Sequence, residues 1–238
     1  MCDFKNACDF NSDTGDDGQK MPRIASVHLD GCPFPHAVAR LYFDKGGYLF
    51  HQGDAPRGAF HLNTGLVALE RVDEDGRLVV LKVLRPGALF PCADLFAETP
   101  HGTTARALTD TRACFIPRER MLSAMADAST RLALLRCCAQ EARDSENAIF
   151  RLCAGDLGDQ ILAALHVVLD QRREEDGCLH GILPLCWRDL AAMVGTSPEV
   201  MSRTIRRLCK SGRLNVKGRA ITLPPLRGEE RRRALAHG

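Results

Sequence analysis

Between about residues 40 and 117, apolar and polar residues alternate in short runs, and each run ends at a turn residue. A period of two residues is typical of β-strands with one buried face. The clearest predicted strands are residues 48–54, 58–65, 66–71, 78–84 and 112–117. The segment "VDEDG" separates two of these runs and predicts a hairpin turn. The pattern favours an antiparallel sandwich or roll over a parallel α/β sheet, and glycines recur at roughly 7–12-residue intervals at positions 46, 53, 65, 76 and 87.

After Pro117 the pattern changes, and residues 118–176 are helix-forming almost throughout. Apolar and small residues recur there at three- and four-residue spacing, which predicts a long helix with one packed face. Its partner could be the β-domain or the same helix of a second copy, and the second copy is the preferred interpretation. The predicted stripe consists of Leu132, Leu135, Ala139, Ala142, Glu146, Ile149 and Leu152.

Residues 185–223 predict a helix-turn-helix followed by a wing. Residues 189–194 form a short helix pattern with Leu190, Ala191 and Val194 on one face, and Gly195 supplies the turn. Ser197 is a favourable N-cap and Pro198 suits the first position of a second helix. Helix, short glycine-containing turn and helix are the signature of this DNA-binding motif. The following "KSGRLNVKGRAITL" predicts a glycine turn and two short strands.

The second helix, "SPEVMSRTIRRL", separates into two faces. Met201, Ile205 and Leu208 recur at i, i+4 and i+7 and are predicted to face inwards. Glu199, Ser202, Arg203 and Arg206 are predicted to face outwards, and we interpret them, with Ser197, as DNA-contacting residues. A glutamate can accept from the cytosine amino group, and an arginine can donate to guanine. The alternative is that Glu199 and Arg203 form an exposed i,i+4 ion pair, which would add little to the stability of the helix.

The charge distribution favours the nucleic-acid interpretation. The net charge is only +2, but from Trp187 onwards twelve Lys or Arg residues face four Asp or Glu residues. A basic end indicates a polyanionic partner. We expect several of these cations to contact phosphates, which raises affinity without selecting a sequence. They are Arg206, Arg207, Lys210, Arg213, Lys217 and Arg219.

Composition limits the remaining classes. The N-terminal 20 residues are acidic and lack the apolar core of a secretory signal, and no apolar stretch reaches the length of a membrane span. A cytoplasmic location is therefore expected. Eleven cysteines in a reducing compartment favour buried thiols, metal or redox chemistry over disulfides. We expect six of them to be small buried residues: Cys137, Cys138, Cys153, Cys178, Cys186 and Cys209.

These motifs together resemble the Crp–Fnr superfamily of bacterial transcription regulators over nearly the whole chain. "GGYLFHQGD" and "RPGALF" are similar to the family's effector domain, and Glu199, Ser202 and Arg203 match its E-x-x-S-R recognition helix. The resemblance implies an α+β fold: a Cys-containing leader (1–35), a cyclic-nucleotide-binding-like antiparallel β-roll (36–122), a dimerisation helix (123–153) and a winged helix-turn-helix domain (154–238). It implies a homodimer, a TTGAT-like palindrome and RNA polymerase as partner.

The resemblance leaves the sensed signal open. Cyclic AMP is disfavoured because the Arg-Ser pair of nucleotide-binding members is missing and "CAD" replaces Gly-Glu-Leu. Fnr-type members hold a four-iron–four-sulfur cluster on four cysteines. By that resemblance the ligands here would be Cys2, Cys8, Cys32 and Cys114, with Cys92 as a competing ligand. No C-x-x-C is present, which departs from the pattern.

Three alternatives remain. The N-terminal thiols could act as a thiol/disulfide switch. Some family members sense nitric oxide through haem, for which His28, His36, His51, His61 and His101 are possible axial ligands. A thiol enzyme using Cys92 with His101 is a remote alternative. Since the chain has no recognisable nucleophile–base pair, HExxH or phosphate-binding glycine loop, we do not expect an enzyme. We expect instead a regulator, with activation as the assumed direction.

Overall fold

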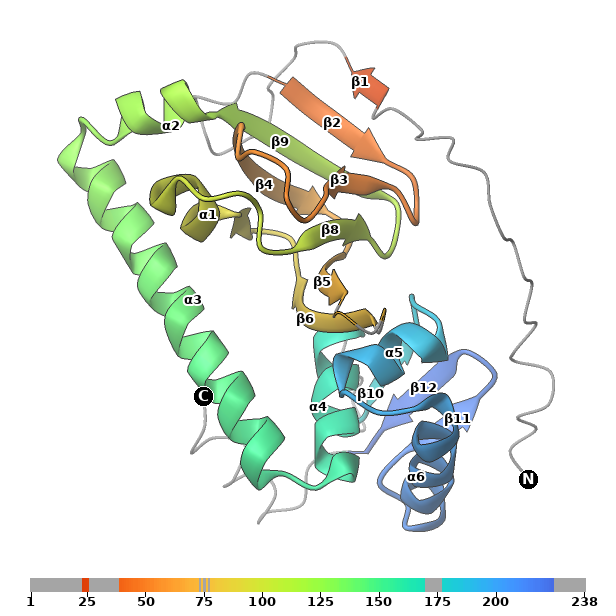
Figure 1. Ribbon diagram of the computed structural model, residues 1–238. Helices are drawn as coiled ribbons and strands as arrows, with labels where there is room; N and C mark the ends of the chain where they lie inside the picture. The colour runs from red at the N-terminus through yellow and green to blue at the C-terminus, as the bar shows by residue number, and fades with distance from the viewer. Residues whose placement is uncertain are drawn as a thin grey trace. The chain divides into compact units, whose positions relative to one another are not determined.

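The computed structural model describes residues 39–72, 74, 76, 78–169 and 177–224, together with the backbone of the short strand β1 (Arg23–Ala25) and of the last residues of α3. The chain divides into two compact units at the boundary between Glu146 and Asn147. Each unit is described below by itself. Figure 1 labels their helices and strands.

The first unit contains two antiparallel sheets. One has the strand order β1-β2-β9-β4-β7, with β2 (Ala39–Phe43), β9 (Thr111–Pro117), β4 (Gly58–Thr64) and β7 (Leu89–Phe90). The other has the order β3-β8-β5-β6, with β3 (Tyr48–Phe50), β8 (Thr104–Ala107), β5 (Val67–Val72) and β6 (Leu78–Leu84). The predicted hairpin is confirmed, since β5 pairs antiparallel with β6 and joins Val72 to Leu78. The predicted antiparallel roll is therefore present.

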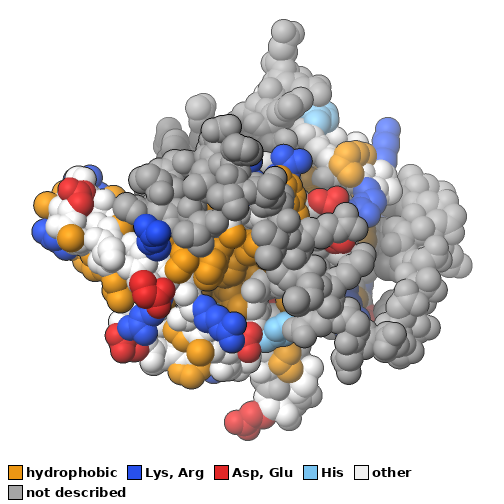
Figure 2. Space-filling model, turned by 90° about the horizontal axis from the view of Figure 1, so that it is seen from above, with side chains coloured by type: hydrophobic (Ala, Val, Ile, Leu, Met, Phe, Trp, Pro, Cys, Tyr) orange, Lys and Arg blue, Asp and Glu red, His pale blue; other side chains and the backbone are white. Residues whose placement is uncertain are grey.

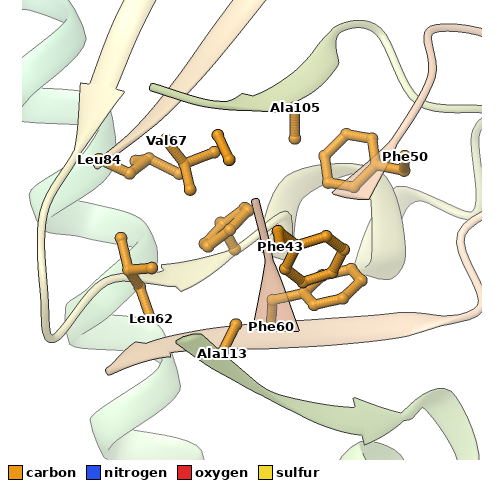
Figure 3. Packing of buried hydrophobic residues seen from close by; sticks show 10 residues of the cluster. Phe43, Phe50, Phe60, Leu62, Val67, Leu84, Ala105 and Ala113 are labelled. Carbon is orange, nitrogen blue, oxygen red and sulfur yellow. The ribbon is translucent and has the colours of Figure 1, made fainter. Parts of the chain in front are cut away.

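Phenylalanines fill the space between the two sheets. Phe60 lies at the centre, with its ring centroid 6.1 Å from that of Phe50 and 5.8 Å from that of Phe90. Figure 3 shows the rings of Phe50 and Phe60 together with Leu62, Val67 and Leu84, which come from both sheets. Because such spacing is within the favourable range for aromatic pairs, the cluster holds the sheets together by both burial and ring contacts.

Two glycines show why the recurring turn residues matter. Gly65 adopts φ +92°, and a Cβ there would lie 2.6 Å from the carbonyl oxygen of Asp110. A Cβ on Gly58 would lie 2.3 Å from the carbonyl oxygen of Ile116. Glycine is required at Gly65 because a side chain has neither the conformation nor the space, and at Gly58 because it has no space.

Two helices and most of a third complete this unit. The short α1 (Cys92–Ala97) follows β7 and was not predicted. After β9 comes α2 (Arg118–Ala124), and the long α3 (Ala128–Ala154) follows a break. The predicted dimerisation helix starts at residue 123, whereas α3 starts at Ala128 because Asp127 is its N-cap. Asp127 accepts from the Thr130 backbone N–H at 2.8 Å, and its hydrogen bonds to Ser129 and Thr130 lower its pKa to about 2.

The long helix α3 carries two distinct faces. One face packs against the sheets through Leu134, with Cys137 and Cys138 half-buried beside it. The other carries the predicted stripe: each of its members from Leu132 to Ile149 is exposed in this single chain. The side chain of Leu152 lies outside the described residues. The stripe therefore does not pack on the chain's own β-domain.

The second unit contains α4 (Leu157–Val168), α5 (Trp187–Met193) and α6 (Pro198–Lys210). A three-stranded sheet of order β10-β12-β11 accompanies them, with β10 (Leu179–Ile182), β12 (Ala220–Leu223) and β11 (Asn215–Lys217). The hairpin of β11 and β12 is the predicted wing, and β10 is a third strand that was not predicted. The α+β class with a C-terminal winged helix-turn-helix is confirmed.

On the face of the molecule seen in Figure 2, charged side chains do not single out one region. In the view of Figure 2, Lys and Arg side chains are interspersed with Asp and Glu, and a patch of hydrophobic side chains lies between them. No helix in the described part of the chain is long and apolar enough to cross a membrane.

Candidate nucleic-acid interface and sensing residues

The turn between α5 and α6 is held by local hydrogen bonds. Gly195 adopts φ +65°, and the Thr196 N–H donates to the Ala191 carbonyl at 3.0 Å. Ser197 caps α6, because its hydroxyl accepts from the Val200 N–H. Pro198 follows at the first helical turn, where a missing N–H costs nothing. The predicted start of the second helix is confirmed.

The inner face of α6 anchors it to the rest of the unit. Met201, Ile205 and Leu208 are at most 3% exposed. Leu190, Ala191 and Val194 of the preceding helix-turn segment are also buried. Burying each large side chain stabilises the unit by roughly 1.5–3 kcal/mol. The orientation of α6 is therefore fixed by packing.

The outer face presents the predicted reading residues. Glu199, Arg203 and Arg206 are exposed and Ser202 is half-buried. A side-chain hydrogen bond from Ser197 lowers the pKa of Glu199, and Arg203 adds a smaller electrostatic contribution in the same direction. Glu199 is consequently an acceptor at neutral pH, and Arg203 beside it is a donor. The structure brings these groups together on one solvent-facing side of one helix.

The surrounding cations differ in how they are held. Arg206 and Lys217 are exposed, as are Arg207 and Lys210. Arg213 instead forms an ion pair with Asp159 of α4 at 2.7 Å. Arg219 donates to the Leu183 carbonyl from Nε at 3.1 Å and from Nη2 at 2.7 Å. Arg213 and Arg219 therefore have structural partners that the sequence did not indicate.

Sequence reasoning omitted one cation of the preceding helix. Arg188 is exposed in the first turn of α5. In helix-turn-helix proteins the first helix crosses the DNA backbone, so a cation there can contact phosphate. The sequence feature that could have indicated Arg188 is its position directly after Trp187, the first residue of this helix.

Among the predicted cluster ligands, the structure describes Cys114. It lies on β9, is fully buried, and its thiol donates to Asn63 Oδ1 at 3.2 Å. Cys2, Cys8 and Cys32 lie outside the described residues. No group of three or more potential metal ligands occurs within the described residues. One enclosed thiol does not fit a cluster that needs four thiolates, so the described part of the chain does not by itself form such a site.

Cys92, the predicted competing ligand, has different neighbours. It is fully buried at the start of α1, and its thiol donates to the Leu89 carbonyl at 3.6 Å. Burial raises its pKa, and Cys137 and Cys138 of α3 raise it further.

The six cysteines expected to be buried are less enclosed than predicted. The side chain of Cys153 lies outside the described residues. Cys186 is exposed, because it stands at the N-cap of α5 and accepts from the Asp189 N–H at 3.4 Å. The other four are half-buried: Cys137, Cys138, Cys178 and Cys209.

The described histidines already have protein partners or a buried position. His101 Nδ1 lies 3.1 Å from Asp94 Oδ2, and the centroid of its ring lies 4.0 Å from that of the Phe50 ring. His51 lies beside Asp54, and burial lowers the pKa of His61. His28 and His36 lie outside the described residues. The geometry therefore selects no haem ligand among the histidines that the structure describes.

The segment between β7 and β8 carries little positive charge. Arg106 is the sole Lys or Arg between Leu89 and Ala107. Its guanidinium bonds to Glu70, with Nε 3.0 Å from each carboxylate oxygen. A cyclic phosphodiester placed in this segment would therefore have to compete with Glu70 for its cation.

Comparison with known proteins is consistent with both halves of this description. Residues 40–128 match the model of the cyclic nucleotide-binding domain, and residues 160–228 match the Crp-like helix-turn-helix domain. The chain belongs to the Crp/Fnr family of transcription regulators. The predicted family is thereby confirmed.

The chain is similar to several Crp/Fnr regulators, and the name of one of them states its signal. The transcriptional activator FnrA of Stutzerimonas stutzeri is 26% identical over 183 residues, covering 75% of this chain and 74% of that protein. The CRP-like cAMP-activated global regulator of Mycobacterium tuberculosis is 25% identical over 199 residues, covering 79% and 88%. A Crp/Fnr-family regulator of Thermus thermophilus has a solved structure with a TM-score of 0.67 and 27% identity, covering 84% of this chain and all of that one.

Cys92 and His101, the pair of the remote thiol-enzyme interpretation, contact different groups in the structure. Cys92 interacts with Leu89 and the α3 thiols, whereas His101 pairs with Asp94. A raised pKa makes Cys92 a poor nucleophile at neutral pH. The remote thiol-enzyme interpretation gains no support from either residue.

Proposed function

We propose that this protein is a homodimeric regulator that binds a TTGAT-like palindrome in response to a redox signal. The observation that carries the proposal is the outward Glu199–Ser202–Arg203 face of α6, whose opposite side is buried. Glu199 accepts from a cytosine amino group, Arg203 donates to guanine, and Ser202 adds a base or phosphate contact. Membership of the Crp/Fnr family supports this use of the helix.

Affinity comes from phosphate contacts around these three residues. The exposed cations of α6 and the wing, above all Arg206 and Lys217, lie on the same unit as the reading face. Ser197 caps the N-terminal end of α6, where the first backbone N–H groups of the helix lie. Arg213 contributes to phosphate binding only to the extent that it leaves Asp159.

Dimerisation is proposed to use the exposed stripe of α3. Leu135 is 65% exposed and Ile149 61% exposed in the single chain. Apolar side chains at three- and four-residue spacing on a 27-residue helix are typical of a helix that pairs with another helix. Two reading helices are then presented to successive DNA turns. RNA polymerase is the proposed protein partner of the DNA-bound dimer.

The proposed redox signal is carried by cysteines. A four-iron–four-sulfur cluster would need Cys2, Cys8 and Cys32 in addition to Cys114, and such a cluster supplies reversible sensitivity to oxygen when bound. The described residues include one of the four thiols. The presence of the cluster is therefore tested by the iron and sulfide content of the purified protein. The protein purified without oxygen should contain iron and acid-labile sulfide and show broad visible absorbance; a sharp Soret band would indicate haem instead.

The regulator proposal is tested by DNA binding. Fluorescence anisotropy with a duplex carrying a TTGAT palindrome should show binding in one redox state that exceeds binding to a scrambled duplex by at least about 10³-fold. Equal affinity for both duplexes in the reduced and oxidised states would overturn it. Salt dependence, measured in the same assay, separates phosphate contacts from base contacts.

Cyclic nucleotide control is a second candidate, favoured by the domain match at residues 40–128 and by the cAMP-activated relative. The bonding of Arg106 to Glu70 argues against it. Titration calorimetry with cyclic AMP decides between them. We expect no heat of binding at millimolar cyclic AMP. Binding with a micromolar Kd would instead show that the regulator responds to a cyclic nucleotide.

A further inference from the structure

Two thiols from distant parts of the chain meet between α1 and α3. Cys92 opens α1, and Cys137 lies 45 positions later in α3, yet their side chains share a hydrogen bond. Both belong to one packed cluster with Leu95 and Leu134. The two residues lie in the same compact unit, so their contact does not depend on how the units are arranged.

We propose that Cys92 and Cys137 form an oxidisable dithiol that closes to a disulfide and ties α1 to α3. The neighbouring Cys138 is also half-buried at this cluster, but the thiol that hydrogen-bonds with Cys92 is that of Cys137. Cys138 therefore provides a matched control at the adjacent position. This site is separate from the proposed cluster ligand Cys114, whose thiol is bonded to Asn63.

The two thiols are not equivalent. Cys92 is fully buried, whereas Cys137 is half-buried and so is the one that a small oxidant reaches. Burial raises the pKa of both thiols, but the hydrogen bond acts in opposite directions: it raises the pKa of Cys92 and lowers that of Cys137. Lys82 also lowers the pKa of Cys137, and Glu141 raises it. The pair therefore ionises first at Cys137, and the Cys92 S–H, which otherwise donates to the Leu89 carbonyl, then turns to the Cys137 sulfur.

Because the two thiols differ, we assign the order in which they react when hydrogen peroxide is the oxidant: Cys137 first and Cys92 second. The Cys137 thiolate attacks one peroxide oxygen, the O–O bond breaks, and the products are a sulfenic acid and, after protonation, water. Because its pKa is raised, Cys92 reacts only as its proton passes to the departing hydroxide of the sulfenic acid. The Cys92 sulfur bonds to the Cys137 sulfur, the S–O bond breaks, and a second water leaves. Two thiols and one peroxide give one disulfide and two waters.

The bond would join two functionally distinct elements. Helix α1 lies within the segment that matches the cyclic nucleotide-binding domain, and α3 carries the exposed stripe on its other face. Lys82 and Glu141, an ion pair at 3.5 Å, join the same helix to β6 near this position. The effect of the disulfide on DNA affinity rests on the proposed function, whereas its formation does not.

The full-length chain offers a direct test by peptide mapping. Trypsin releases Cys92 in residues 83–106, and it releases Cys137 together with Cys138 in residues 137–143. After reduction, treatment with hydrogen peroxide and alkylation, a non-reducing digest of a protein that migrates as a single chain should contain these two peptides joined. Dithiothreitol should separate them. Wild type lacking the joined peptide after peroxide treatment would overturn the proposal.

Three variants identify the partner thiol. The joined peptide should persist in Cys138→Ser and be absent from Cys92→Ser and Cys137→Ser. Its persistence in Cys137→Ser, or a bond within residues 137–143 alone, would contradict the assignment. Circular dichroism of each reduced variant checks the fold, and Cys137→Ser is the decisive one because its side chain is half-exposed and the change is small.

The regulatory consequence is measured separately. DNA affinity of Cys138→Ser should change at least about tenfold when the disulfide forms, and that of Cys137→Ser should not change with peroxide. A joined peptide without any change in affinity would remove the regulatory role. If no variant binds DNA in either state although the joined peptide forms, the proposed function fails and the dithiol stands.

Discussion

Arg106 and Glu70 form a buried ion pair that links β8 to β5. The Arg106 Nε lies 3.0 Å from both carboxylate oxygens, Nη2 lies 3.0 Å from Oε2, and the two side chains are 17% and 6% exposed. The pair fixes the one Lys or Arg that the chain carries from the start of β7 to the end of β8. Its geometry is the planar two-point contact for which arginine is suited.

We expect Glu70→Ala to destabilise the protein by about 3 kcal/mol, because it leaves the guanidinium buried without this carboxylate. The double variant Glu70→Met with Arg106→Met should recover most of that loss, since it removes both charges. Thermal unfolding followed by circular dichroism compares the three proteins. If Glu70→Ala is as stable as the double variant, solvent already hydrates the Arg106 guanidinium enough to replace the lost carboxylate.

Arg203→Ala should weaken binding to the palindrome by about 1–3 kcal/mol and relax the preference at one base pair. Lys217→Ala is the control for a phosphate contact, because Lys217 is exposed on the wing. It should weaken binding to specific and scrambled duplexes alike and reduce the salt slope by about one. Arg213 is less suitable for this purpose, since its ion pair with Asp159 would also be lost. Uniform weakening by both substitutions would contradict base reading by Arg203.

Ser197→Ala should lower stability by about 1 kcal/mol through loss of the α6 cap. It should also raise the pKa of Glu199 towards its ordinary value of 4.5, because the Ser197 hydrogen bond is the largest cause of the lowered pKa. A lowered pKa means that Glu199 stays ionised until the pH falls through that lowered value. Carbon-detected NMR titration of Glu199 in both proteins measures the change, and an unchanged midpoint would refute the contact.

Leu135→Lys should weaken self-association at least about tenfold, because it places a charge in the proposed helix pair. Leu81→Lys is the matched control: Leu81 is 53% exposed but belongs to β6 and not to the α3 stripe. Sedimentation analysis of both variants over a range of concentrations gives the two association constants. Equal weakening by Leu81→Lys, or none by Leu135→Lys, would place the dimer contact elsewhere.

The features predicted from the sequence are those that depend on local pattern. The two faces of α6 follow from the spacing of Met201, Ile205 and Leu208, and the β5–β6 hairpin follows from alternation around a turn. The cap on Ser197 needs only the next three residues. These predictions hold because the same few neighbouring residues determine both the pattern and the structure.

The features that were missed depend on contacts between residues far apart in the chain. Arg213 meets Asp159 across 54 positions, and Arg219 meets the Leu183 carbonyl across 36. Neither pairing leaves a periodic signal. The short helix α1 was missed because Pro91 precedes only six helical residues, which are too few to show a helical period.

If α6 reads DNA as we propose, its split into a buried and a solvent-facing side makes operator choice and fold stability independently adjustable. Substitutions at Glu199, Ser202 and Arg203 alter groups that contribute little to the core, whereas the residues that hold the helix, Met201, Ile205 and Leu208, are buried on its other side. A protein built this way can exchange one target sequence for another while its melting temperature stays almost constant.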